Sequence, residues 1–184
     1  WTPANAPDEK LPVYVWIYGG GFQTGFTAEM EFDGERIARR GIVVVTLCYR
    51  LNMFGFMCHP EISAENPNAP ANFGLLDQRM AMQWVKDNIE AFGGDANNIT
   101  IGGQSAGGGS VINQILYGPK NLFNRAVCHS GMFLMPGNNI MIPRTLAEAE
   151  KLGEDFFNFA GCKTLAEIRK LSTDQLRKLW DEYG

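Results

Sequence analysis

The hydrophobic pattern of the first 130 residues predicts alternating strands and helices. Short apolar runs, rich in β-branched and aromatic residues, indicate buried strands at residues 12–18, 42–47 and 98–102, with a further candidate at 125–129. Helical patterns occupy residues 32–40, 74–92 and 106–117. Together they predict an α/β fold with a largely parallel sheet and helices on both faces.

The helix predicted at residues 74–92 is apolar around most of its girth. Its longer polar side chains form one narrow stripe at Arg79, Gln83, Lys86 and Glu90. A helix with this pattern is predicted to pack on more than one side. Asp77, Gln78 and Asn88 fall inside the apolar arc, so we expect each of them to be hydrogen-bonded there.

Two regions depart from the alternation. Residues 58–71 are polar and contain three prolines, which predicts a surface loop. From Thr145 onward, three Ser/Thr-x-x-Glu/Gln capping boxes, beginning at Thr145, Thr164 and Ser172, predict three short helices. We therefore expect one partial domain over residues 1–184, with the sheet core in 1–136 and the start of a helical region in 137–184.

Composition narrows the range of partners. The 184 residues carry a formal net charge of -4 without a cluster of Lys and Arg, which argues against nucleic acid or an anionic membrane. The longest apolar stretch is far too short to span a bilayer. The four cysteines lack metal-ligand spacing, and we expect neither a metal nor a cofactor. The chain starts at Trp1 rather than Met, so the pattern leaves the compartment open.

The chemistry centres on residues 103–107, which read Gly-Gln-Ser-Ala-Gly. A predicted strand enters this Gly-x-Ser-x-Gly motif and a predicted helix leaves it, which is the context of a nucleophile elbow. Such a turn forces an unfavourable backbone conformation on Ser105, and side chains at Gly103 and Gly107 would clash. The helix N-terminus adds partial positive charge beside the serine. The alternative is a glycine-rich turn that is structural or cradles a phosphate.

A second glycine-rich segment, Gly19-Gly20-Gly21, follows the first predicted strand. Acyl transfer places negative charge on a carbonyl oxygen, and backbone N–H groups aimed at that oxygen stabilise it. Removing one such donor costs about 3 kcal/mol in the barrier. Taken alone, the segment could be a flexible turn; paired with the Ser105 motif, it indicates an oxyanion hole.

Five stretches, in this order, resemble the type B carboxylesterases, a family that includes the cholinesterases. They are "PVYVWIYGGGF", "YRLNMFGF", "NFGLLDQRMAMQWVKDNIEAFGGDANNITI", "GQSAGGGSV" and "FNRAVCHSG". The resemblance runs from residue 1 to about 131 and continues more loosely through the helical tail. It implies an α/β-hydrolase fold and hydrolysis of a small-molecule carboxylic ester through an acyl-serine intermediate.

The resemblance also implies roles for individual residues. Ser105 matches the family nucleophile, and the backbone amides of Gly20, Gly21 and Ala106 match the oxyanion hole. Ser130 matches a serine that supports the catalytic triad from behind.

In this family the triad residues follow the chain order Ser, then Glu or Asp, then His. Both later members lie downstream of the matched region, so the resemblance implies an internal fragment that lacks them and is inactive by itself. His59 and His129 match neither position. We expect a structural or surface role for each.

Two positions bear on specificity. Tyr18 stands where many esterases have His, but cholinesterases also carry Tyr there. Gln104 stands where cholinesterases have Glu, which argues against a quaternary-ammonium substrate.

Two other functions stay open. One is a non-catalytic, cholinesterase-like binding or adhesion protein; the intact Ser105 and glycine segment count against it. The other is an esterase of the hormone-sensitive-lipase-like branch; the "FGGD" and "LLDQ" blocks favour type B.

Overall fold

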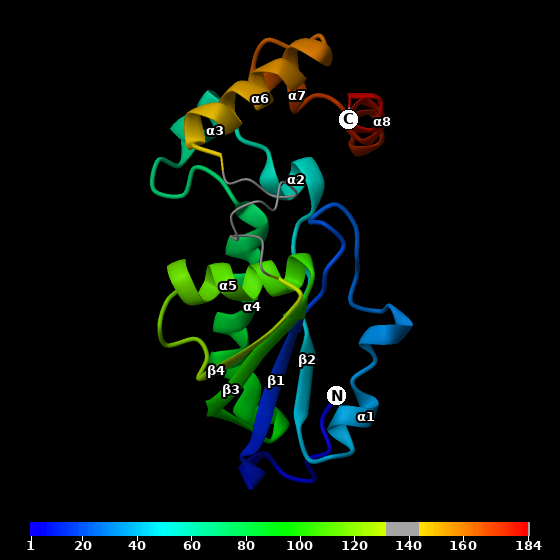
Figure 1. The fold of residues 1–184 in the computed structure, drawn as a ribbon, viewed down its shortest axis with the longest axis vertical. Helices are drawn as coiled ribbons and strands as arrows, with labels where there is room; N and C mark the ends of the chain where they lie inside the picture. Colours follow the sequence, from blue (N-terminus) through cyan, green and yellow to red (C-terminus); the bar gives the residue numbers. More distant parts are fainter. Residues whose placement is uncertain (132–143, 184) are drawn as a thin grey trace.

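The computed structural model describes residues 1–131 and 144–183. Four parallel strands form one sheet in the order β2-β1-β3-β4 (Figure 1). The strands are β1 (Leu11–Ile17), β2 (Val43–Thr46), β3 (Gly94–Gln104) and β4 (Arg125–His129). The predicted parallel sheet is confirmed. Strand β3 begins four residues before the predicted start, because the turn after the preceding helix already pairs with β1 at Gly94.

Eight α-helices and three 3₁₀ turns lie in the described residues. The α-helices are α1 (Glu35–Ala38), α2 (Asn52–Phe56), α3 (Pro60–Glu65), α4 (Phe73–Asn88), α5 (Ala106–Tyr117), α6 (Leu146–Phe159), α7 (Leu165–Ile168) and α8 (Thr173–Tyr183). The 3₁₀ turns are Pro7–Glu9, Met30–Phe32 and Ile89–Phe92. The helix predicted at 32–40 is thus a short α1 preceded by a 3₁₀ turn.

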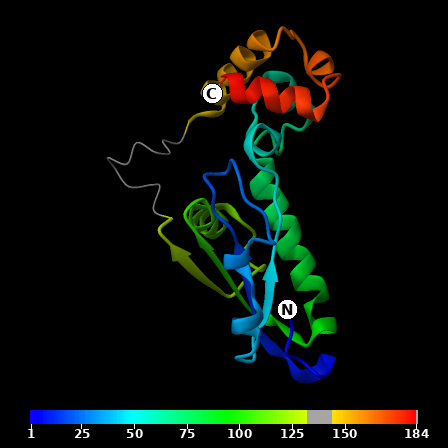
Figure 2. The same cartoon turned by 90° about the vertical axis from the view of Figure 1, so that its right-hand side faces the viewer.

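Helices cover both faces of the sheet, as predicted. The connection through α1 runs from β1 to β2, whereas α4 and α5 connect strands in the opposite direction along the sheet. Right-handed crossovers of opposite direction lie on opposite faces. In Figure 2, α1 lies towards the viewer, whereas α4 runs lengthwise beside the sheet at the right of the view and α5 is seen end-on. The main core, which includes Val15, Ile101 and Val111, lies between the sheet and these two helices.

Helix α4 departs from the expected packing. Met82 and Val85 are 1% exposed against the core, but Met80 is 73% and Trp84 51% exposed. The prediction that this helix packs on more than one side is therefore wrong for the described chain. The polar residues of its apolar arc are hydrogen-bonded as expected, Asp77 to Arg50, Gln78 to Ser110 and Asn88 to the carbonyl of Trp84.

The loop predicted at residues 58–71 contains α3. Pro60 occupies the first helical position, where its fixed φ and missing N–H cost nothing. The His59 side chain accepts a hydrogen bond from the Glu61 N–H at 3.2 Å and so caps the helix. Three prolines indicated an irregular loop, but one of them begins a helix.

A second core joins the C-terminal helices to α2. Phe156 and Phe157 of α6 are buried there against Met53 of α2. The three predicted helices α6, α7 and α8 are all present. The capping boxes at Thr145 and Ser172 are complete, whereas Thr164 only accepts from the N–H three residues on. The boundary predicted between residues 136 and 137 lies outside the described residues.

Candidate active site

Ser105 lies at the junction of β3 and α5 in the strained conformation that the motif predicted. Its φ of 55° and ψ of -123° fall in a region that residues other than glycine rarely adopt. Two backbone hydrogen bonds hold it there. Its N–H donates to the carbonyl of His129 at 2.9 Å, and its carbonyl accepts from the N–H of Gly109 at 2.9 Å.

The glycines on either side of Ser105 are required by close backbone approach. A Cβ built on Gly103 would collide with the backbone carbonyl of Gly107. A Cβ on Gly107 would collide with the carbonyl of Ile17 at the end of β1. The close approach of strand and helix that the motif predicted is therefore present. Because both positions are glycine, α5 can begin directly over β1 and β3.

The glycine segment after β1 lies directly beside the elbow. A Cβ built on Gly19 would lie 3.1 Å from the Cβ of Ser105. Gly20 and Gly21 have φ values of 97° and 63°, which turn the chain sharply. The Gly20 carbonyl accepts hydrogen bonds from the N–H groups of Gln23 and Thr24, at 3.0 and 3.1 Å, and this closes the turn.

Three backbone N–H groups near this turn have no partner among the described residues. Within residues 1–131 and 144–183, the N–H groups of Gly20, Gly21 and Ala106 donate to no other group. Ala106 is the first residue of α5, where N–H groups have no partner inside the helix and the helix dipole is positive. Such donors beside a serine can stabilise a negatively charged oxygen.

The segment around Tyr49 anchors the glycine loop at both ends. The Tyr49 hydroxyl donates to the Tyr18 carbonyl at 2.8 Å, and the two rings stack with centroids 4.6 Å apart. Burial, with a smaller contribution from Tyr18, raises the pKa of Tyr49, so this donor keeps its proton at neutral pH. The N–H of Asn52 donates to the Phe22 carbonyl at 2.7 Å. Sequence reasoning did not single out Tyr49 or Asn52.

The residues of β4 and Ser130, whose segment accepts the hydrogen bond from the Ser105 N–H, are exposed to solvent. Strand β4 is exposed along its whole length, and Ser130, which follows it, is exposed as well. The triad-supporting role expected of Ser130 stays a prediction. The His129 imidazole lies near the ring of Trp16, with centroids 6.3 Å apart.

His59 has the expected structural role, since it caps α3 and stacks on Phe157 with ring centroids 4.0 Å apart. Across the described residues, neither imidazole is hydrogen-bonded to Ser105 Oγ.

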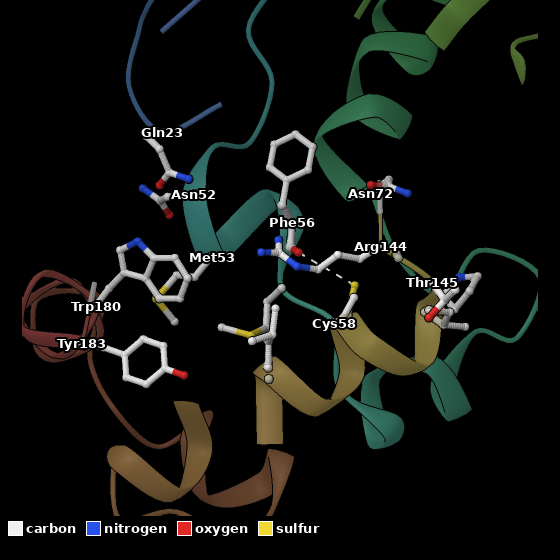
Figure 3. A pocket seen from close by; sticks show the side chains of 17 residues that line it. Gln23, Asn52, Met53, Phe56, Cys58, Asn72, Arg144, Thr145, Trp180 and Tyr183 are labelled. Atoms are coloured by element: carbon white, nitrogen blue, oxygen red, sulfur yellow. Dashed lines mark hydrogen bonds between the residues drawn. The ribbon is translucent and has the colours of Figure 1, made fainter. Parts of the chain in front are cut away.

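A cavity of about 610 Å³ separates the glycine loop from the C-terminal helices (Figure 3). Gln23, two residues beyond Gly21, lies on its rim. Its wall is largely apolar and includes Met53 and Phe56 from α2 and Trp180 from α8. Such a lining suits an uncharged organic group. Among the described residues there is no cluster of three potential metal ligands, and no helix long and apolar enough to cross a bilayer.

A serine on a strained turn between a parallel strand and a helix is the arrangement found in α/β hydrolases. The family model described as "Carboxylesterase family" matches residues 1–180. The chain belongs to the carboxylesterase family.

Individual relatives agree with this assignment. Fumonisin B1 esterase of Sphingopyxis macrogoltabida is 41% identical over 186 residues, which cover 97% of this chain and 32% of the relative. Bile salt-activated lipase of Bos taurus is 43% identical over 188 residues, covering 94% of this chain and 30% of the relative. The chain therefore spans about a third of the length of the curated relatives it matches.

Solved structures show the same fold. A carboxylesterase of Geobacillus stearothermophilus superposes with a TM-score of 0.85 at 37% identity, over 100% of this chain and 38% of the other. A PNB esterase superposes with a TM-score of 0.82 at 36% identity, over 97% of this chain and 37% of the other. The chain forms part of an α/β-hydrolase fold.

Proposed function

We propose that these residues are the nucleophile-bearing part of a serine carboxylic ester hydrolase. The observation that carries the proposal is the strained Ser105 beside the glycine loop, with the N–H groups of Gly20, Gly21 and Ala106 unpartnered among the described residues. Ser105 Oγ attacks the ester carbonyl, and the N–H groups of Gly20, Gly21 and Ala106 bind the oxygen that becomes negative. The alcohol then leaves, and water hydrolyses the acyl-serine.

The attack needs a base that removes the proton from Ser105 Oγ and later gives it to the leaving alcohol. His59 is occupied in capping α3, and His129 is directed towards Trp16. We assign the base to a histidine outside these 184 residues, held by an acid that also lies outside them. The chain by itself is then an inactive half-site.

The substrate class follows from two local features. Gln104, next to the nucleophile, is exposed and uncharged, so it supplies no negative charge to attract a quaternary ammonium group. The cavity beside the glycine loop has a mostly apolar wall. We therefore propose uncharged carboxylic esters as substrates.

A non-catalytic binding protein is the alternative from a different class. It is disfavoured because backbone strain such as that at Ser105 costs of order 1–3 kcal/mol and persists where the site needs it. A protein that only binds a partner gains nothing from holding a serine in that conformation beside free donors.

A labelled fluorophosphonate tests the assignment in the full-length protein that carries these residues. We expect one covalent adduct on Ser105, identified by peptide mass spectrometry, and complete loss of labelling in Ser105→Ala. Ser63→Ala, which removes a hydroxyl from α3, is the matched control and keeps the adduct. Absence of an adduct on Ser105 in folded wild-type protein would overturn the proposed function.

A further inference from the structure

A buried polar chain connects helix α4 to the elbow. Gln78 and Ser110 are each 0% exposed. Gln78 Nε2 donates to Ser110 Oγ at 2.9 Å, and Ser110 Oγ donates to the carbonyl of Ala106 at 3.0 Å. Gln114, 1% exposed, donates to Gln78 Oε1 at 3.1 Å and so fixes the orientation of the Gln78 amide. The chain ends on the residue whose N–H is one of the three unpartnered donors.

The neighbouring residue of α4 connects to the glycine loop. Asp77 accepts three hydrogen bonds from Arg50, one from its backbone N–H at 2.9 Å and two from its guanidinium at 2.8 Å. These bonds hold the pKa of Asp77 below its usual value even though burial opposes the shift. Arg50 immediately follows Tyr49, which holds the Tyr18 carbonyl ahead of the glycines. Adjacent residues of one helix thus hold both halves of the donor set.

The two halves come from segments far apart in the sequence, and their relative position decides whether they can bind the same oxygen. Donors must lie within about 2.7–3.1 Å of the developing charge, and a misplacement of about 1 Å can cost 10²-fold in rate. We propose that α4 is the spacer that sets this separation, with Gln78 and Ser110 as positioning residues for Ala106. The inference rests on the proposed function and deepens it.

Stability alone does not explain the polar residues. Replacing both partners of a buried hydrogen bond by apolar groups of similar shape can be nearly neutral. If the contact between α4 and α5 contributed only packing, Met at position 78 and Ala at position 110 would therefore give about the same stability as the native residues. A fully satisfied polar chain instead fixes one relative position of the helices.

The test compares stability with rate in the full-length protein. We expect Ser110→Ala to lower both the thermal midpoint and kcat, because it leaves the buried Nε2 of Gln78 without an acceptor. Gln78→Met should lower kcat too but lower the midpoint less, because Ser110 Oγ keeps its bond to the Ala106 carbonyl and Gln114 Nε2 keeps its bond to the Leu75 carbonyl. The double variant Q78M/S110A removes both partners, so its midpoint returns towards the wild-type value. Its kcat for p-nitrophenyl acetate stays about 10-fold below wild type, with KM changed less than about 2-fold, since ground-state binding does not use the donors. Gln83→Met on the exposed face of α4 is the matched control.

Recovery of both midpoint and kcat in the double variant would overturn the spacer role, since packing would then account for everything. Fluorophosphonate labelling of wild-type Ser105 is measured in parallel, so failure of the proposed function is seen separately. If the double variant does not fold, Ser110→Ala alone decides. A kcat that falls no further than its folded fraction contradicts the proposal, and a larger fall supports it.

Discussion

The residues on the two sides of Ser105 differ in how far they are buried and hydrogen-bonded. Behind it, the joint between α4 and α5 is closed, with Gln78 and Ser110 fully buried and every polar atom of the pair hydrogen-bonded. On the other side, all five residues of β4 are exposed, and so is Ser130 beyond them. The joint between α4 and α5 is thus buried and fully hydrogen-bonded like a protein interior, whereas β4 is an exposed edge of the described sheet.

This difference separates two parts of the proposed mechanism. In that mechanism, binding of the oxyanion depends on the glycine loop and the start of α5, and residues within the described ranges hold both. Proton transfer depends on a base, and neither imidazole is joined to Ser105 by a hydrogen bond in the described ranges. The elbow can therefore adopt its final conformation independently of the groups that activate it.

The largest expected effect is on catalysis. We expect the isolated 184-residue chain to hydrolyse p-nitrophenyl acetate no faster than its own Ser105→Ala version, because we have assigned the base of Ser105 to a histidine outside these residues. In the full-length protein the same substitution should lower kcat/KM by about 10⁴-fold or more. Initial rates with both pairs measure this directly.

If the isolated chain shows turnover that depends on Ser105, the two sides of Ser105 do not differ as proposed, and a base must lie within the 184 residues. His129 would be the first candidate, because its carbonyl already bonds to the Ser105 N–H. Loss of that turnover in His129→Ala would then identify it.

A smaller effect is expected on stability at the closed side. Gly107→Ala would drive a Cβ into the Ile17 carbonyl, and backbone has little freedom to move. We expect a loss of about 3 kcal/mol, the upper part of the range for overpacking. The matched control is Gly41→Ala, whose Cβ would meet open space and whose φ of 84° alone costs about 1 kcal/mol. Urea unfolding of the full-length protein compares the two, and equal costs would mean that α5 is held less tightly over β1 than its geometry indicates.

Much of the fold was predictable because its signals are local. The strand at 125–129 and the helix at 106–117 have the predicted bounds, since apolar runs and flanking turn residues specify them directly. The elbow was predictable from five consecutive residues, and the position of three polar residues in the apolar arc of α4 indicated that each is hydrogen-bonded. The short helices α2 and α3 were missed, because tertiary packing rather than periodicity stabilises helices of five or six residues.

The remaining features depend on contacts between distant segments. The hydrogen bond from Tyr49 to Tyr18 joins residues 31 apart, and that from Gln78 to Ser110 joins residues 32 apart. No periodicity or spacing rule indicates such partners. The Gly-x-Ser-x-Gly motif placed Ser105 on the turn between β3 and α5, but the residues that hold its surroundings could be found only from the structure.

The smallest expected effect concerns the open side, where Val127 of β4 is 39% exposed. In the isolated chain, Val127→Ala should change the free energy of unfolding by less than about 0.5 kcal/mol, as for surface substitutions generally. Relatives are about three times as long, so we expect further chain to cover β4 in the full-length protein. There the same substitution removes two buried methyl groups and should cost about 1 kcal/mol more.

Urea unfolding of both proteins, each with and without the substitution, gives the difference. Equal small costs would show that β4 is an exposed edge in the whole protein too. The exposure of β4 would then be a permanent feature of this fold, and no other part of the protein would cover it.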